Sequence, residues 1–187
     1  EVSWVDWSLA EKNKDFLRFV REMIQFRKRH PALRRNTFFR GEFARQDPTK
    51  ALGSGDSGPL KRLPPKTPPV PPSLVGLADI YWHGTELGAP DFTDESREIA
   101  YVIDGRFSGR EDVAPKGDND IYVAINGNDV ATAFMIPPSP QGRRWKRVID
   151  TALTSPNDIV PEEKGKVVAE GSRYPVGPFS VVVMVTE

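Results

Sequence analysis

The sequence predicts a mainly β protein, an antiparallel β-sandwich preceded by one amphipathic α-helix. Short strand-like runs separated by Gly, Pro, Asn and Asp fill the second half of the chain, as is typical of sandwiches and barrels. No helical pattern intervenes after Arg35, which argues against a parallel sheet. Before Arg35, apolar residues recur at helical spacing instead.

The helix is expected to run from about Lys12 to Arg29. Its apolar stripe consists of Phe16, Phe19, Val20, Met23, Ile24 and Phe26. A stripe this wide needs a partner surface, because burying one Phe or Met side chain stabilises by roughly 1.5–3 kcal/mol. We therefore expect the helix to pack on the sandwich or on a second copy of the chain. Packing on a second copy would make the chain a homo-oligomer.

The ends of the helix carry recognisable signals. Ser8 and Glu11 have capping-box spacing, and Asp15 is the alternative cap for a helix that starts slightly later. Basic residues fill the last turn, where they complement the helix dipole. Pro31 is the expected stop.

Strands are expected where apolar and polar residues alternate or where short apolar runs end in turn residues. The expected strands are 79–83, 98–104, 120–126, 130–136, 145–151, 166–170 and 179–186. Residues 126–129, Asn-Gly-Asn-Asp, have the composition of a hairpin turn. The last strand is apolar on both faces and should lie centrally in its sheet.

Residues 37–76 are expected to form a linker with a Pro-rich insertion. Gly53 to Gly58 is flexible by composition, and seven prolines follow between Pro59 and Pro72, which favours extended polyproline geometry. A stiff insertion is the favoured interpretation. The alternative is that Pro-Pro-Val-Pro-Pro is a ligand of an SH3-type domain.

The bulk composition excludes several classes of function. With 26 basic and 26 acidic residues, no overall field would steer the chain to nucleic acid or to a membrane surface. The chain has no cysteine, which rules out disulfides and thiolate chemistry and favours a reducing, cytoplasmic location. It has neither a membrane-spanning run nor a signal peptide, and because it does not start with Met it is expected to be a fragment.

No cluster of residues predicts catalysis or a metal. His30 and His83 are isolated, and no Gly-x-Ser-x-Gly motif is present, so structural roles are favoured for both. Asp118, Asn119 and Asp120 resemble a calcium-type oxygen cluster but lack the other signatures of an EF-hand loop. A solvated turn is the favoured interpretation, with no cofactor and no metal expected.

A resemblance to a known family comes from the N-terminal region. Trp4-Val5-Asp6-Trp7 is followed by a helix that contains Phe-Val-Arg-Glu-Met-Ile-Gln-Phe-Arg-Lys-Arg-His-Pro-Ala-Leu. This arrangement resembles the end of the catalytic barrel of isoamylase-type glycogen-debranching enzymes, which belong to the α-amylase family. The helix would be the last of the (β/α)8 ring.

Later segments resemble the C-terminal β-domain of the same family. They are 79–84, 120–126, 145–151 and 179–185. In the first of these, Asp-Ile-Tyr-Trp-His-Gly, one spacing of the family's Asp-Ile-x-Trp-x-x-x-Gly stretch is shortened. The resemblance is weakest from Arg45 to Leu77, where the Pro-rich insertion replaces a usually short link.

The resemblance implies a division into three parts and a parent enzyme. Residues 1–36 would be the end of the barrel, 37–76 the linker and 77–187 the C-terminal sandwich. The parent would hydrolyse α-1,6 branches of glycogen or limit dextrin with retention of configuration. Its catalytic carboxylates would lie upstream of Glu1, so no catalytic residue is assigned here and the chain alone lacks the paired carboxylates that this hydrolysis needs.

Trp4, Asp6 and Trp7 are the only residues expected to approach the parent's substrate cleft. A tryptophan face can stack on a sugar ring, and Asp6 could orient a sugar hydroxyl. The favoured alternative is structural, with both tryptophans wedged against the barrel, and Asp6 could instead cap backbone N–H groups. Trp82 and Trp145 are expected in the core or at the edge of the sandwich.

Three functions remain open at this stage. The first is a non-catalytic domain that braces the barrel of a debranching hydrolase. The second is an independent carbohydrate-binding module, which would need exposed aromatic rings. The third is a protein-interaction module that uses the helix and the Pro-rich segment. The first has the most support from individual residues, and its partners would be the parent's own barrel and, through it, glycogen or another α-glucan.

Overall fold

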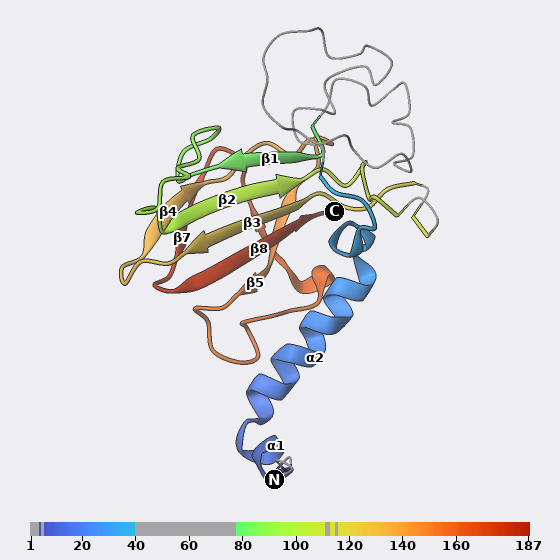
Figure 1. The fold of residues 1–187 in the computed structure, drawn as a ribbon, viewed down its shortest axis with the longest axis vertical. Helices are drawn as coiled ribbons and strands as arrows, with labels where there is room; N and C mark the ends of the chain where they lie inside the picture. Colours follow the sequence, from blue (N-terminus) through green and yellow to red (C-terminus); the bar gives the residue numbers. More distant parts are fainter. Residues whose placement is uncertain (1–3, 5, 40–77, 111–112, 115) are drawn as a thin grey trace, which may run out of the picture.

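The computed structural model describes residues 4, 6–39, 78–110, 113–114 and 116–187. Most of the predicted linker, including its Pro-rich part, therefore lies outside the described residues. The described part consists of one helical arm followed by an antiparallel β-sandwich (Figure 1). This confirms the predicted fold class.

The helical arm is made of α1 (Leu9–Lys12), α2 (Lys14–Arg29) and the short 3-10 helix η1 (Pro31–Arg34). The helix expected from about Lys12 to Arg29 is confirmed as α2, and the short α1 is separated from it at Asn13, whose φ of −110° and ψ of 33° are not helical. Its end at Arg29, before Pro31, agrees with the prediction. Residue His30 is extended there, as expected for a residue that precedes proline.

The two predicted N-terminal caps are wrong in detail. Ser8 lies at the N-cap of α1, but its side chain makes no capping bond; its hydroxyl donates to Asp6 instead. Asp15 lies inside α2, and its carboxylate accepts a hydrogen bond from Ser155 Oγ at 3.1 Å. Both side chains are thus engaged by partners that the local spacing does not reveal.

Within the described residues, eight strands form two antiparallel sheets. They are β1 (Ile80–His83), β2 (Glu98–Ile103), β3 (Ile121–Asn126), β4 (Thr132–Met135), β5 (Trp145–Asp150), β6 (Lys166–Val168), β7 (Arg173–Val176) and β8 (Ser180–Thr186). The six-stranded sheet has the order β1-β2-β3-β8-β5-β6, and β4 pairs with β7 in the second sheet. Strand β8 lies in the middle of the larger sheet, as its two apolar faces predict.

The predicted hairpin at residues 126–129 is wrong. Strand β3 pairs with β2 and β8, whereas β4 belongs to the other sheet. The side-chain amide of Asn126 donates to the carbonyls of Val130, Val176 and Gly177, and so holds the chain where it crosses between sheets. Strand β7 was not expected, because it is short and contains Pro175.

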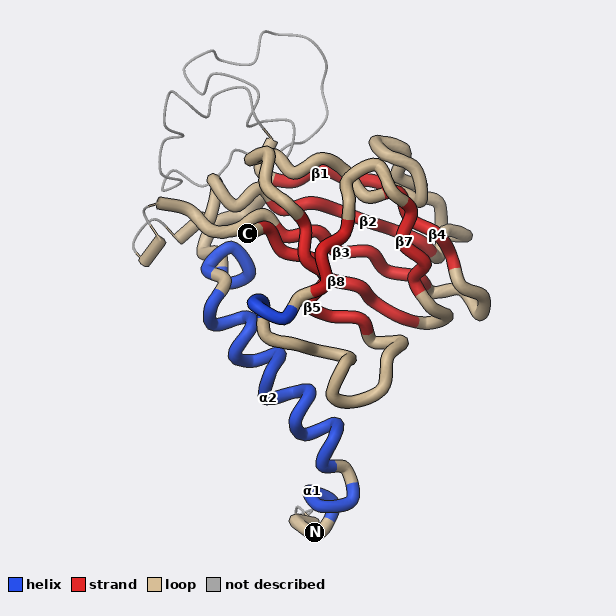
Figure 2. Tube along the Cα trace, turned by 180° about the vertical axis from the view of Figure 1, so that it is seen from behind, coloured by secondary structure: helices blue, strands red, loops and turns tan. Residues whose placement is uncertain are grey.

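The larger sheet separates two apolar layers. On one face, Tyr122, Trp145 and Met184 pack with Phe134 of β4 and Val176 of β7. On the other face, strand residues pack with Phe26 of α2 and Ala32 of η1. The two-stranded sheet and the helical arm therefore cover opposite faces of the six-stranded sheet, as Figures 1 and 2 illustrate.

Only part of α2 takes part in this packing. Phe26 is buried, and Phe19 and Met23 pack against the same cluster. The opposite end of α2 and all of α1 extend beyond the sandwich in both views (Figures 1 and 2). The expectation that the helix packs on the sandwich is thus confirmed for the face of α2 that carries Phe19, Met23 and Phe26.

Candidate functional site

The turn that follows α2 is held to the sandwich by several polar contacts. Pro31 forces the chain out of the helix, and the turn carries His30 into the interior, where it is 2% exposed. The His30 ring lies against Phe26, with ring centroids 4.5 Å apart. This places a polar ring in the middle of an otherwise apolar contact.

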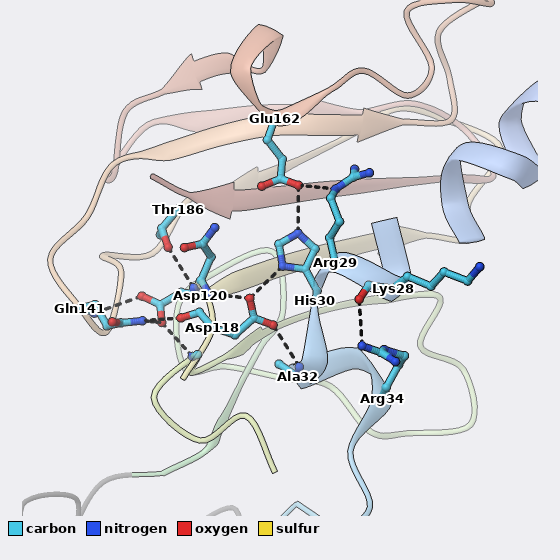
Figure 3. A network of polar contacts seen from close by, with 12 residues as sticks. Lys28, Arg29, His30, Ala32, Arg34, Asp118, Asp120, Gln141, Glu162 and Thr186 are labelled. Carbon is cyan, nitrogen blue, oxygen red and sulfur yellow. Dashed lines mark hydrogen bonds and ion pairs between the residues drawn. The ribbon is translucent and has the colours of Figure 1, made fainter. Parts of the chain in front are cut away.

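The carboxylate of Asp118 fixes this turn from the sandwich side. His30 Nδ1 lies 3.0 Å from Asp118 Oδ1, and the backbone N–H of Ala32 donates to Oδ2 at 3.0 Å (Figure 3). Both oxygens of one buried carboxylate are therefore used to hold two positions of the helix exit. A charge-assisted pair of this kind is among the stronger hydrogen-bonding arrangements in proteins.

Glu162 approaches the same turn from the 3-10 helix η4 (Glu162–Lys164). Its Oε1 accepts a hydrogen bond from Arg29 Nε at 3.1 Å. His30 Nε2 lies 3.3 Å from the same oxygen, without the geometry of a regular hydrogen bond (Figure 3). The imidazole is thus held between two carboxylates from different segments of the sandwich.

Two arginines hold the arm on either side of this turn. Arg18, in the N-terminal half of α2, pairs with Asp158 and donates from Nε to Ser155 Oγ at 3.2 Å. Arg35, just after η1, pairs with the buried Asp79 at 2.9 Å. We call the contacts of His30, Ala32, Arg18 and Arg35 with the sandwich the junction.

Asp120 has a structural role next to the junction. Its buried carboxylate accepts hydrogen bonds from the backbone N–H of Gly105, the hydroxyl of Ser139 and both the backbone and side-chain nitrogens of Gln141. Asp118 is engaged by the helix exit. Among the described residues, no group of three or more His, Cys, Asp or Glu side chains is arranged to hold a metal ion.

A second polar pair joins the sheets. Tyr174 of β7 donates its hydroxyl to Asp150 Oδ2 at the end of β5, at 2.8 Å. Burial raises the pKa of Tyr174 to about 12, and the hydrogen bond to Asp150 and its negative charge act in the same direction. The neutral phenol is therefore the form that the folded protein favours.

His83 also makes a structural contact. Its Nδ1 accepts a hydrogen bond from the backbone N–H of Gly88 at 2.9 Å. Partial burial lowers the pKa of His83, which favours the neutral ring that can accept this bond. This agrees with the structural role predicted for it.

The three predicted substrate-binding residues lie far from the junction, at the free end of the arm. Trp4 and Trp7 are 92% and 80% exposed. Asp6 accepts hydrogen bonds from the backbone N–H and hydroxyl of Ser8, at 2.9 and 2.6 Å, and these bonds lower its pKa. Asp6 thus binds the start of α1, and a contact of any of the three with a sugar stays a prediction.

Of the other two tryptophans, Trp145 is in the core and donates Nε1–H to Pro137 O at 2.7 Å. Trp82 lies on the edge strand β1 and is 41% exposed. Sequence reasoning missed His30 as the centre of the junction. The only local signal was its position directly before Pro31, and its partner Asp118 is 88 residues away.

The described residues thus define an antiparallel β-sandwich domain with an N-terminal helical arm packed on one face of its larger sheet. Comparison with known proteins makes this specific. The model of the family described as "Isoamylase 1-3, C-terminal" matches residues 81–184. The chain belongs to this family, and the match coincides with the sandwich from β1 to β8.

Curated relatives agree with this assignment. The chain is 29% identical to isoamylase 3, chloroplastic, of Oryza sativa over 95% of its own length and 28% identical to isoamylase of Pseudomonas amyloderamosa over 80%. It is also 28% identical over 81% to a glycogen operon protein GlgX homolog of Mycobacterium tuberculosis. The chain spans 16%, 14% and 18% of these relatives, about a sixth of their length.

Proposed function

We propose that this chain is the non-catalytic C-terminal part of an isoamylase-type glycogen-debranching enzyme and that it braces the catalytic barrel. The enzyme would hydrolyse α-1,6 branches of glycogen or limit dextrin. Support for the enzyme class comes from relatives that are named isoamylases and from one named for a glycogen operon. The proposed division of the chain remains 1–36, 37–76 and 77–187.

The bracing role rests on one observation, the divided packing of α2. Phe26 is buried on the sandwich with Phe19 and Met23 packed beside it, whereas Phe16, ten residues before Phe26 on the same helix, is 68% exposed. Trp7, Leu9 and Ile24 are also exposed. An apolar face of this size needs a partner, and the catalytic barrel would supply one if α2 is its last helix.

The junction is suited to transmit such a contact. Arg18, His30 and Arg35 connect the arm to three different segments of the sandwich. A helix fixed in this way cannot rotate or slide relative to the sheet without breaking buried polar contacts. The sandwich would therefore hold α2 in one orientation against the barrel.

Trp4, Asp6 and Trp7 would lie where the arm enters the barrel. Trp4 and Trp7 either stack on sugar rings near the cleft or pack against the barrel wall, and the second role agrees better with the bracing function. The cytoplasmic location also stays a proposal, which rests on the absence of cysteine.

Activity measurements test the proposal. We expect the purified chain to release no reducing ends from glycogen, and the longer polypeptide that contains it to release them. In the longer polypeptide, Phe16→Gln should lower both the thermal midpoint and the activity, because the barrel loses an apolar contact. The matched control is Val130→Gln, an exposed position on the sandwich.

Two results would contradict the proposal. Hydrolysis of glycogen by a clean sample of the chain alone would place catalytic groups within it. Equal effects of Phe16→Gln and Val130→Gln in the longer polypeptide would mean that α2 has no partner there.

A further inference from the structure

One row of side chains crosses the helix-covered face of the large sheet. In the strand register, Trp82 pairs with Tyr101, Tyr101 with Val123, and Val123 with Val183. Val123 and Val183 belong to the cluster that includes Phe26 of α2. One end of the row therefore lies under α2, and its other end is the exposed Trp82 on the edge strand β1.

Three aromatic rings gather at this uncovered end. The ring centroids of Trp82 and Tyr101 are 5.3 Å apart, and those of Trp82 and Phe92 are 5.9 Å apart in an edge-to-face arrangement. Trp82 and Phe92 are both exposed. The neighbours fix the Trp82 ring in place, so that little side-chain freedom remains to be lost when a ligand stacks on it.

An open groove of about 660 Å³ runs beside Trp82, within the usual size range of small-molecule sites. Its floor is apolar, formed by Ile80, Ile103 and Leu33. Phe38 and Phe39, both exposed, line it together with Tyr101. The groove therefore offers several aromatic faces on one open surface.

The charged groups that line the groove favour a neutral ligand. Among the described residues that line it, Arg35 alone is charged, and its guanidinium pairs with Asp79 and lies 4.4 Å from the centre of the Phe39 ring. Asn36 and Thr37 add uncharged polar side chains beside the aromatic rings. An anionic or cationic ligand would lose its hydration here for no new ion pair.

We infer that this groove, with Trp82 at its edge, binds a neutral oligosaccharide, an α-glucan. Sugar rings combine apolar C–H faces, which stack on aromatic side chains, with hydroxyls that Asn36 and Thr37 can bond. The preference for a neutral sugar rests on the groove itself, whereas the choice of an α-glucan rests on the proposed function. The site would hold a glucan chain on the sandwich, next to the junction, since Ala32 and Arg35 line the groove.

Calorimetric titration of the whole 187-residue chain with maltoheptaose tests the inference. Saturable binding is expected, and Trp82→Ala should weaken it at least tenfold, because the main stacking surface is lost. Trp82→Phe should retain most of the affinity, since a flat ring remains. The matched control is Phe16→Ala, which removes an exposed aromatic ring outside the groove and should leave the affinity unchanged.

Three outcomes would overturn the inference. The first is no saturable binding by the wild-type chain, and the second is equal affinity of Trp82→Ala and wild type. The third is a dimer in sedimentation that Trp82→Ala dissociates, which would assign the groove to a second copy. Equal affinities for cellohexaose and maltoheptaose would overturn the choice of an α-glucan. These binding results are independent of the activity of the longer polypeptide, which tests the proposed function.

Discussion

The carboxylate of Asp118 connects two parts of the chain that are far apart in sequence. It accepts the Ala32 N–H and contacts the His30 ring. We expect His30→Ala to lower the free energy of unfolding by about 2–3 kcal/mol, from the cavity and from the partner that Asp118 loses. Urea denaturation measures this, with Lys28→Ala, on the exposed last turn of α2, as a control that should change it by less than about 0.5 kcal/mol.

A double-mutant cycle separates the pair from its surroundings. If His30 and Asp118 interact directly, His30→Ala and Asp118→Ala together should cost at least about 1 kcal/mol less than the sum of the two single changes. Strict additivity would show that the two side chains stabilise the junction independently.

The phenol of Tyr174 makes stability depend on pH in the alkaline range. Its pKa is raised to about 12 in the folded protein, against about 10 in an unfolded chain. The folded state therefore holds the proton more tightly, so this contribution is complete below pH 10 and is lost as the pH rises from about 10 to about 12. Tyr174→Phe should show a shallower loss of stability between pH 9 and pH 11.5, measured by urea midpoints.

Parallel stability curves for Tyr174→Phe and wild type would contradict this. At neutral pH the variant should differ only by the lost hydrogen bond to Asp150, about 1 kcal/mol. The difference in the free energy of unfolding at neutral pH is the reference against which the differences measured at alkaline pH are compared.

At the scale of elements, α2 carries one buried and one exposed phenylalanine that can be compared directly. Phe26 is 3% exposed and Phe16 is 68% exposed. In the 187-residue chain, Phe26→Ala should cost about 3–5 kcal/mol, because a buried ring is removed, whereas Phe16→Ala should cost less than about 0.5 kcal/mol. Chemical denaturation of the two variants checks this, and similar costs would mean that the whole helix packs on the sandwich.

The strands show how far local sequence predicts this fold. Alternation and paired apolar faces located seven of the eight strands and the central position of β8. Strand β7 is not predicted because Pro175 is unusual inside a strand. The turn after β3 has the composition of a hairpin, whereas the Asn126 side chain binds the carbonyl of Val176 and the chain passes to the other sheet. At the N-terminal end of the predicted helix, Asn13 separates the short α1 from α2.

The candidate sites were less predictable than the strands. The positions of Trp4, Asp6 and Trp7 at the free end of the arm agree with their place before the helix. The contact of His30 with Asp118 and Glu162 depends on how distant segments meet, and no local motif encodes such a pairing. The exposure of Trp82 was likewise not readable, because an edge strand and a core strand have similar alternation.

At the scale of the whole molecule, the arm packs on the sandwich and leaves apolar side chains such as Phe16 exposed to solvent. Phe26 of α2 and Ala32 of η1 are buried on one face of the large sheet, and the exposed groove at β1 lies on the same face. No described helix is long and apolar enough to cross a membrane. The remaining apolar surface of the arm is the part for which we propose the barrel as partner.

Amide hydrogen exchange of residues 9–16 tests the bracing role most directly, when it is compared between the 187-residue chain and a longer polypeptide that adds the proposed barrel. We expect fast exchange of this segment in the chain alone, since its side chains are exposed apart from the half-buried Ala10. In the longer polypeptide we expect strong protection of the same segment, with residues 25–30 protected in both proteins. Equal exchange of residues 9–16 in the two proteins would contradict the proposal that the arm carries the contact between the sandwich and the barrel.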